Sequence, residues 1–275
     1  MSLVLFTSMV GLLIAPEKVS FTVSIISLFA VALGAGAAGA LNMWYESDLD
    51  ALMTRTCLRP IPTGRVQKNQ ALWFGIILSI ISISLLYFTA NLVSSILLAV
   101  TIGFYFFIYT IWLKRRTPQN IVIGGAAGAL PPVIGWAIAT NSISAESIIL
   151  FLIIFIWTPS HFWALSLYKS SDYKKAKIPM LPITSGIQTT KLNILIYSLL
   201  MAPVVALPYF FNFGSLFYLM LSSLMTSYYV YLCAILFKEK NNKISNIIAR
   251  KIFVYSIFYL FFIFVLILAD NIIQY

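Results

Sequence analysis

Charged residues are scarce in this chain. Only 9% of its 275 residues are Asp, Glu, Lys or Arg, whereas 61% are hydrophobic, and the mean hydropathy is +0.95. Soluble domains carry about 25% charged residues, so this composition excludes a soluble protein and indicates one that crosses a membrane several times. The net charge of +10 comes from basic residues in short segments between apolar runs. This placement indicates membrane orientation and argues against binding to nucleic acid.

Cysteine and histidine are also rare. The two cysteines, Cys57 and Cys233, lie far apart, and their spacing excludes a redox motif and a cysteine-based metal site. His161 is the only histidine. Imidazole ligates haem iron and transfers protons near neutral pH, but a single histidine near a helix end equally suits a structural role. The residue alone leaves both roles open.

Long apolar runs predict nine membrane-spanning helices. Most of them approach the roughly 20 residues that a helix needs to cross a bilayer, whereas the first, at about 15 residues and 1.5 Å per residue, reaches only about 22 Å. We therefore expect an all-α polytopic membrane protein, in one domain (1–275), with the helices around a cavity open to the cytoplasmic side. The predicted spans are 1–15, 21–41, 70–90, 92–112, 121–139, 147–168, 193–211, 215–237 and 251–269.

Basic residues are concentrated in alternate loops. All but one of the 18 lysines and arginines follow the second, fourth, sixth or eighth span, and only Lys18 lies on the other side. By the positive-inside rule these loops are cytoplasmic, which places the N-terminus inside and the C-terminus outside. Because no transit peptide is recognised, we expect a bacterial inner membrane in preference to a mitochondrial one.

Acidic residues are concentrated in one stretch. Glu46, Asp48 and Asp50 fall within five positions, directly after the apolar run 21–41, in a chain with only 8 acidic residues. If the helix continues beyond this run, Asn42, Glu46 and Asp50 share one face, because they are spaced by four residues. Oxygen ligands in this arrangement suit Mg²⁺, which usually binds one or two carboxylates together with substrate phosphates. The alternative is a solvated helix end with a few ion pairs.

No Asp, Glu, Lys or Arg lies in the middle of a predicted span. Secondary transporters commonly place their coupling groups near the midplane of the membrane. Here the acidic residues lie at the cytoplasmic edge instead. This favours an enzyme that receives a charged head group from the cytosol while the tail of the substrate lies in the membrane. A small transporter of an amphipathic anion is the alternative from another class.

Glycines recur in two of the predicted spans. Small residues four positions apart let membrane helices approach closely, and this packing role is the simplest interpretation. Room for a large flat ligand is the functional alternative. The glycines are Gly34, Gly36, Gly39, Gly124, Gly125 and Gly128.

Three longer stretches carry motifs. They are NMWYESDLDALMTRTCLRPIPTGR (42–65), WLKRRTPQNIVIGGAAGALPPVIGWA (112–137) and TPSHFWALSLYKSSDYKKAKIPMLPI (158–183). The first is similar to the first aspartate-rich motif of the UbiA-type intramembrane prenyltransferases, and the order and spacing of all three resemble that family. Asp172 is the single aspartate of the third stretch. In this respect the chain is most similar to the protohaem IX farnesyltransferase (haem O synthase) branch and differs from the quinone-forming branch.

The resemblance implies that farnesyl diphosphate and protohaem IX (haem B) are the substrates and that haem O is the product. It implies catalytic carboxylates at Glu46, Asp50 and Asp172, which together with Asn42 would hold Mg²⁺ against the diphosphate. The resemblance also suggests two further partners: the lipid bilayer, and a haem A synthase or terminal oxidase assembly. Prenylation of another acceptor, a quinone or chlorin ring, is the alternative within the class. Substrate contacts are expected from Asn42, Asp48, Arg55, Arg59, Lys114, Arg115, His161, Tyr168, Lys169 and Lys175.

The chain departs from the family pattern at two positions. The family usually has Asp where this chain has Glu46, and Arg where it has Ser47. Glutamate keeps the carboxylate but moves it by one methylene group, so we expect metal binding with altered geometry. Serine at position 47 lacks the charge with which arginine could bind a phosphate.

Overall fold

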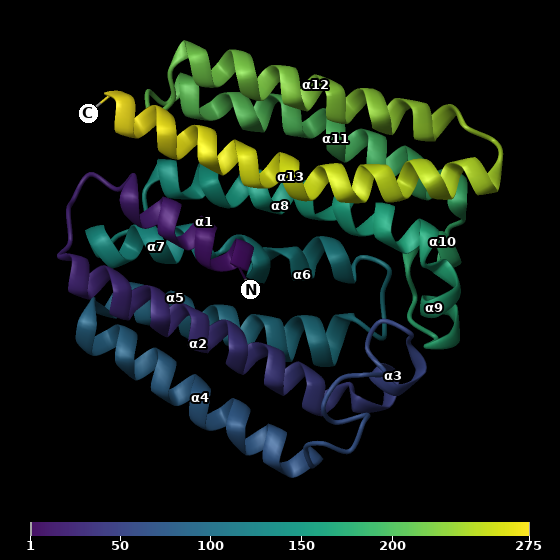
Figure 1. Cartoon of the computed structure of the whole chain (residues 1–275), viewed down its shortest axis with the longest axis horizontal. Helices are drawn as coiled ribbons and strands as arrows, with labels where there is room; N and C mark the ends of the chain where they lie inside the picture. Colours follow the sequence, from purple (N-terminus) through teal and green to yellow (C-terminus); the bar gives the residue numbers. More distant parts are fainter. Residues whose placement is uncertain (1, 275) are drawn as a thin grey trace.

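The computed structural model describes residues 2–274, and within this range all regular structure is helical (Figure 1). Eight helical segments are long and apolar enough to cross a membrane, and a ninth helix, α1 (Ser2–Leu13), is apolar but shorter. Eight of the nine predicted spans are thereby confirmed, and the remaining one, 1–15, corresponds to the shorter apolar helix α1. The longer segments are α2 (Phe21–Tyr45), α4 (Lys68–Thr89), α5 (Leu92–Gly103) with the π-helix η1 (Phe104–Leu113), α6 (Asn120–Ala129) with α7 (Pro131–Thr140), α8 (Ala145–Tyr168), α11 (Ile187–Phe210), α12 (Leu216–Lys238) and α13 (Asn242–Gln274).

The long helices run roughly parallel to one another and form two groups. In Figure 1, α11, α12 and α13 pack with α8 along one side of the molecule, and α2, α4 and α5 pack along the other. The short helices α1, α6 and α7 lie between the groups, with α1 packed on α7 and α6 packed on both α8 and η1. Each group has its own cluster of buried apolar side chains.

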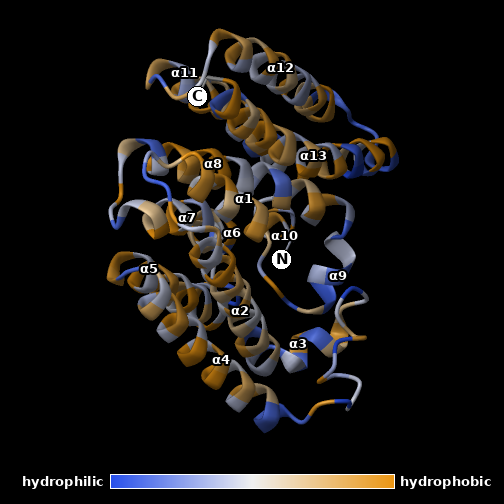
Figure 2. Cartoon of the chain, turned by 60° about the vertical axis from the view of Figure 1, so that its left-hand side comes forward, coloured by the Kyte–Doolittle hydropathy of each residue, from blue (hydrophilic) through white to orange (hydrophobic). Residues whose placement is uncertain are grey.

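The outward faces of the helices are apolar. Figure 2 shows the hydrophobic colour along the lengths of the spanning helices and the hydrophilic colour in the connections at their ends. Large apolar side chains point outward, including Phe21, Phe88 and Ile273, each at least 80% exposed. A soluble protein rarely exposes so large an apolar surface, because its contact with water is unfavourable. The protein is an integral membrane protein.

Three short helices gather at one end of the bundle. They are α3 (Ser47–Leu52), α9 (Ser170–Lys175) and α10 (Leu181–Thr184), and they lie beside the loops that carry most of the basic residues (Figure 1). We call this end, which comprises residues 46–67, 114–119, 169–186 and 239–241, the basic end. The turns at 14–20, 90–91, 141–144 and 211–215 form the opposite end. This segregation follows from the alternation of basic and non-basic loops along the chain.

The fifth predicted span is not one continuous helix. It is divided into α6 and α7 at Leu130, because Pro131 and Pro132 have no backbone N–H to continue the hydrogen-bond ladder of α6. Beyond the break, α7 crosses α1 at backbone contact. A Cβ atom on Gly135 would lie 1.9 Å from the carbonyl oxygen of Ser8, and one on Gly11 would lie 2.1 Å from that of Pro132. Glycine is therefore required at both positions.

The fourth predicted span changes its helical type halfway. Residues Phe104–Leu113 form a π-helix, in which the N–H of Lys114 donates to the carbonyl of Tyr109 at 3.0 Å, five residues earlier. Segments of π-helix are rare and occur often at functional sites. The wider turn brings residues five positions apart onto one face. Tyr109 and Lys114 therefore point to the same side.

Candidate active site

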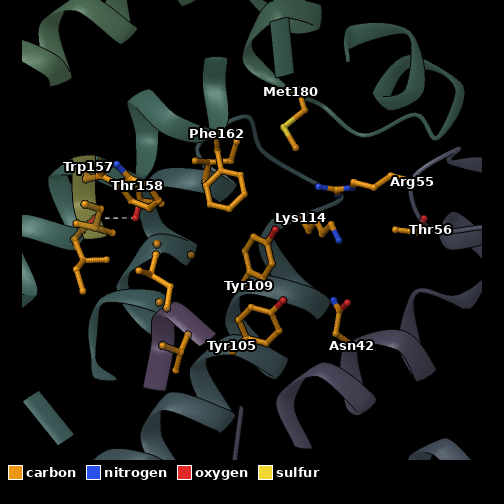
Figure 3. A pocket seen from close by; sticks show the side chains of 18 of the residues that line it. Asn42, Arg55, Thr56, Tyr105, Tyr109, Lys114, Trp157, Thr158, Phe162 and Met180 are labelled. Carbon is orange, nitrogen blue, oxygen red and sulfur yellow. Dashed lines mark hydrogen bonds between the residues drawn. The ribbon is translucent and has the colours of Figure 1, made fainter. Parts of the chain in front are cut away.

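A cavity of about 460 Å³ lies between α1, α2, η1, α6 and α8, next to the basic end. Figure 3 shows Asn42, Arg55, Thr56 and Lys114 on one side of it and Trp157 and Thr158 on the other. The polar part of the lining consists of Asn42, Arg55, Thr56, Arg59, Lys114, Tyr105, Tyr109 and Tyr173. The apolar part consists mainly of Leu3, Val4, Ile121, Ile154, Trp157, Phe162, Met180 and Leu260. Such a lining suits an amphipathic ligand with an anionic head group.

Glu46 does not line the cavity itself, but it contacts two residues that do, Asn42 and Lys114. Its side chain is fully buried, and its Oε2 atom accepts a hydrogen bond from the Asn42 amide at 2.7 Å and forms an ion pair with Lys114. The Asn42 amide also donates to the hydroxyl of Thr110 at 3.1 Å. The Oε1 atom of Glu46 is buried and has no hydrogen-bond partner among the described residues. Glu46 therefore keeps one oxygen without a protein partner, directly behind the polar part of the lining.

The helix that carries these residues does not continue as one straight rod. It ends at Tyr45, Glu46 adopts φ −98° and ψ 14°, and α3 begins at Ser47. Hydrogen bonds four residues apart persist across the break, from Glu46 N–H to Asn42 and from Asp50 N–H to Glu46. The expected contact between Asn42 and Glu46 is present. The expectation of one continuous helix is wrong, because the backbone bends at Glu46.

Asp50 is held by an arginine of its own loop. Its carboxylate is buried and accepts two hydrogen bonds from one nitrogen of Arg59, at 3.0 and 2.9 Å. The loop is further closed by Thr56, whose hydroxyl donates to the carbonyl of Asp50 at 3.0 Å. Since Arg59 and Thr56 both line the cavity, Asp50 fixes two lining residues in place.

Asp48 and Arg115 lie outside the cavity lining. The two side chains form a bidentate ion pair, at 3.0 and 2.8 Å, and the Asp48 side chain is 59% exposed. Partial burial acts to raise the pKa of Asp48, but the hydrogen bonds from Arg115 and from the Leu49 N–H outweigh it and lower the pKa below its usual value. The pair connects α3 to the loop that follows η1. A direct substrate contact of either residue stays a prediction.

Asp172 connects α9 to the first motif. Its carboxylate is buried and accepts a hydrogen bond from the Thr54 hydroxyl at 2.5 Å, across 118 residues of sequence. The next residue, Tyr173, lines the cavity. Burial raises the pKa of the Tyr173 hydroxyl, and the neighbouring Arg55 and Lys114 act in the opposite direction. The bond between Thr54 and Asp172 therefore joins the third stretch (158–183) to the first (42–65) at the basic end.

Three other predicted site residues of the third stretch (158–183) do not line the cavity: Tyr168, Lys169 and Lys175. The ring of Tyr168 lies edge-on against Phe253 of α13, with 5.9 Å between the centroids. Lys169 provides the C-cap of α8, where its N–H donates to the carbonyl of Leu165. Their roles in substrate binding stay predictions.

His161 is packed between aromatic rings. It stacks on Trp157 at 4.2 Å and on Phe253 at 4.6 Å, and its Nδ1 atom forms a 2.6 Å hydrogen bond with the hydroxyl of Ser256. It is absent from the lining of the cavity, whereas its neighbours Trp157 and Phe162 are part of it. The haem contact predicted for His161 stays a prediction, and the observed contacts are those of a packed residue that supports Trp157.

Two tyrosines of η1 are part of the lining and were not among the predicted site residues. Tyr105 and Tyr109 lie with their ring centroids 5.2 Å apart and point into the cavity beside Lys114 (Figure 3). The Lys114 ammonium is 5.7 Å from the centroid of the Tyr109 ring. Their spacing of four residues in an apolar run looks like an ordinary aromatic face of a span. Only the π-helical turn brings them to the same side as Lys114.

The polar part of the cavity fits a Mg²⁺ ion. Among residues 2–274, no three His, Cys, Asp or Glu side chains form a group that could hold an ion. Mg²⁺ needs fewer protein ligands when substrate phosphates complete its coordination. Two oxygen atoms are suitable metal ligands. One is the unpaired Oε1 of Glu46, and the other is the amide oxygen of Asn42, because the hydrogen bonds of Asn42 to Glu46 and Thr110 use only its Nδ2 atom. The donor set therefore suits an ion that arrives with a diphosphate.

The model of the UbiA prenyltransferase family matches residues 4–263. The chain belongs to the UbiA prenyltransferase family. It is 66% identical over 272 residues to the protoheme IX farnesyltransferase of Pelagibacter ubique (strain HTCC1062), with 99% of this chain and 90% of the relative covered. It is 52% identical to the protoheme IX farnesyltransferase of Ehrlichia ruminantium (strain Gardel), with 98% and 90% covered.

Solved structures share the fold of this chain. A structure concerned with digeranylgeranylglyceryl phosphate synthase in membranes has a TM-score of 0.82 at 20% identity and covers 98% of this chain and 93% of that chain. A UbiA homologue from Archaeoglobus fulgidus has a TM-score of 0.66 at 15% identity, with 97% and 96% covered. That homologue is bound to GPP and Mg²⁺. At these identities the likeness concerns the arrangement of the helices.

Proposed function

We infer that the protein is a protohaem IX farnesyltransferase. It transfers the farnesyl group of farnesyl diphosphate to a vinyl group of protohaem IX, with addition of water, and produces haem O and diphosphate. Relatives of this name at 66% and 52% identity support the choice of the acceptor. The structural observation that carries the inference is the cavity, in which Arg55, Arg59 and Lys114 surround a polar end that opens into an apolar space.

The basic side chains of the cavity bind the diphosphate. Arginine and lysine form charge-assisted hydrogen bonds to phosphate oxygens, and these bonds become stronger as negative charge develops on the leaving group. Arg59 and Lys114 are held before substrate binding by Asp50 and Glu46. A Mg²⁺ ion held by Asn42 and Glu46 together with diphosphate oxygens would supply further charge neutralisation. Asp50 and Asp172 as additional ligands stay predictions, because Arg59 and Thr54 already bind their carboxylates. The site is thereby arranged in advance for loss of diphosphate.

The bond changes then follow from the chemistry of an allylic diphosphate. The C1–O bond breaks and its electron pair leaves with the diphosphate. The π electrons of the haem vinyl group form the new bond to C1 of the farnesyl cation, and water adds to the cation left on the haem side chain and releases a proton. The faces of Tyr105, Tyr109 and Trp157 border this space and can stabilise a carbocation. The apolar lining excludes water from the first cation.

The analysis of extracted haems tests this function. Membranes that contain the protein, supplied with haem B, farnesyl diphosphate and Mg²⁺, are expected to yield haem O, identified by its mass. A prenylated quinone or chlorin with no haem O would identify the other acceptor class. Recovery of unchanged haem B and intact farnesyl diphosphate, with movement of the anion across the membrane, would favour a transporter.

We also propose that the basic end faces the cytoplasm of a bacterial cell and lies in the inner membrane, with the C-terminus outside. The concentration of lysine and arginine at this end supports the orientation. Cysteines placed at the exposed positions Asn242 and Ser142, in a background without Cys57 and Cys233, test it with an impermeant thiol reagent. Labelling of Ser142→Cys alone in intact cells is expected. A haem A synthase or terminal oxidase assembly as recipient of the product stays a prediction.

A further inference from the structure

A second, smaller cavity of about 190 Å³ adjoins the candidate active site. The two cavities share Val4, Tyr105 and Gly128 in their linings, so they meet at these residues. The hydroxyl of Thr101, the one other polar side chain of this lining besides Tyr105, donates to the carbonyl of Leu97. The remaining lining is apolar or glycine: Val31, Gly34, Ala35, Ala38, Gly39, Leu98, Ile102, Ala127, Pro131 and Ile134.

The second cavity extends away from the basic end. On α2 the lining of the second cavity runs from Gly39 back to Val31, and on α5 and η1 it runs from Tyr105 back to Leu98, whereas Asn42 lines the first cavity. Eleven residues of helix separate Asn42 from Val31, which corresponds to about 16 Å at a rise of about 1.5 Å per residue. The distance from the polar part of the first cavity to the far end of the second is therefore comparable to the length of an extended farnesyl chain. The direction is that of a chain whose head group is bound at Asn42.

Two glycines of this lining do not serve helix packing. A Cβ atom on Gly39 or on Gly128 would meet nothing within 4 Å. In contrast, a Cβ on Gly34 would lie 2.7 Å from Leu98, and one on Gly124 would lie 2.2 Å from the ring of Tyr109. Close approach of helices therefore explains Gly34 and Gly124 but not Gly39 and Gly128. What these two glycines provide is open space inside the cavity.

We propose that this second cavity holds the distal end of the farnesyl chain, that Gly39 and Gly128 set its width, and that Leu98 limits its length. The proposal rests on the proposed function. An apolar chain gains free energy when it leaves water, in proportion to the area that is buried. Leu98 is 2% exposed and packs over Gly34 at the far end of the lining. With the chain in this cavity, the wider cavity beside Trp157 and Phe162 is left for the porphyrin.

Gly39→Val and Gly128→Val test the width of the cavity. The rates with farnesyl diphosphate and with the shorter geranyl diphosphate are measured on the same sample, so that their ratio does not depend on the amount of folded protein. We expect the farnesyl-to-geranyl ratio to fall at least tenfold in both variants. Gly103→Val is the matched control, because a Cβ at Gly103 also meets nothing within 4 Å although Gly103 lines neither cavity.

Leu98→Ala tests the length of the cavity in the opposite direction. Removal of the isobutyl group extends the far end, so the rate with geranylgeranyl diphosphate is expected to rise relative to that with farnesyl diphosphate by at least threefold. If Leu98→Ala is poorly folded, the ratio is still measured on the folded fraction. A ratio within a factor of two of the wild-type value contradicts the role of Leu98.

Direct binding separates a failure of this proposal from a failure of the proposed function. The affinities for farnesyl and geranyl diphosphate, measured in detergent without any acceptor, give the same selectivity without reference to haem. If the variants change the ratio of the two affinities but the wild type forms no haem O, the second cavity still holds the farnesyl chain. Only the identity of the acceptor is then refuted. Unchanged ratios in Gly39→Val and Gly128→Val, or an equal change in Gly103→Val, overturn the proposal.

Discussion

Two buried carboxylates lie at opposite ends of the bundle and differ in their partners. Asp270, near the end of α13, accepts hydrogen bonds from the backbone N–H and the hydroxyl of Ser215, the residue that caps α12. Glu46, at the basic end, shares one oxygen between Asn42 and Lys114 and keeps its other oxygen buried without a hydrogen-bond partner among the described residues. Glu46 caps an apolar helix and Asp270 lies near the end of another, so their positions in the sequence do not distinguish them.

The difference separates a structural acid from a functional one. Asp270 uses both oxygens on neutral donors, and these bonds hold the start of α12 against α13. An unsatisfied buried polar atom such as Oε1 of Glu46 costs about 1–3 kcal/mol, and a stable fold gains nothing from it. The unpaired oxygen lies at the basic end, where binding of a cation with the diphosphate would satisfy it. The predictions below test this contrast, from the largest expected effect to the smallest.

Asp50→Asn is expected to abolish turnover, and chelation of Mg²⁺ is expected to do the same. The amide keeps the shape of the side chain but removes the charge that orients Arg59 and attracts a cation. Haem O formation is measured by mass in purified samples of equal folded content. Near-normal turnover of Asp50→Asn would remove this residue from the catalytic group.

Glu46→Gln is expected to lower turnover by about 100-fold, the upper range for groups that position or tune a metal ion. The substitution leaves Lys114 without its anion and removes the free carboxylate oxygen. Glu46→Asp restores the residue usual in the family and is expected to retain activity or increase it. Equal activity of Glu46→Gln and wild type would show that the unpaired oxygen has no role in the reaction.

Asp270→Asn is expected to affect stability and not turnover. The loss of charge-assisted bonds to Ser215 should destabilise the fold by about 1–3 kcal/mol. Thermal unfolding in detergent measures this loss, and turnover per folded molecule should stay within a factor of two. A loss of turnover similar to that of Glu46→Gln would remove the distinction between the two ends.

His161→Ala is expected to weaken haem binding more than binding of farnesyl diphosphate. Its ring stacks on Trp157, which lines the apolar part of the cavity. The basic residues proposed to bind the diphosphate lie in the polar part of the lining. Titration of haem, followed by its Soret band, and of a farnesyl diphosphate analogue compares the two affinities. Ser256→Ala, which removes only the hydrogen bond to Nδ1, is the matched control. An unchanged haem affinity and Soret band would leave His161 a purely structural role.

Asp48→Asn is expected to have the smallest effect. The pair with Arg115 is largely exposed, and exposed ion pairs contribute about 0–1 kcal/mol. Because the folded state lowers the pKa of Asp48, the contribution is present above the pKa of the unfolded state and is lost as the pH falls through the lower, folded value. Stability of wild type and variant should therefore converge in acid, below about pH 4, when followed by thermal unfolding. A difference that persists there would contradict this assignment.

Much of the architecture could be predicted because it depends on local properties of the chain. The length of an apolar run determines whether it can cross a bilayer, and this predicted the eight long helical segments, most of them close to their observed bounds. The exception is α13, which begins at Asn242, well before the predicted start at 251. The break at Pro131 and Pro132 also has a local cause, the missing N–H groups, but within an unbroken apolar run it escaped the prediction. The spacing of four residues led to Asn42 and Glu46, and the family resemblance of residues 42–65 added Arg55, in both cases by the order of residues along the chain.

The sequence by itself determined that this is a polytopic helical membrane protein with all but one of its basic residues, and five of its eight acidic residues, toward one end. Tertiary structure alone decided which of these residues meet. Lys114 reaches Glu46 across 68 residues, and Thr54 reaches Asp172 across 118. The π-helical turn that aligns Tyr109 with Lys114, and the open space beside Gly39 and Gly128, likewise depend on how the helices pack. The physical reason is that transfer into a membrane is a property of each segment, whereas contacts and cavities are properties of segments that pack together.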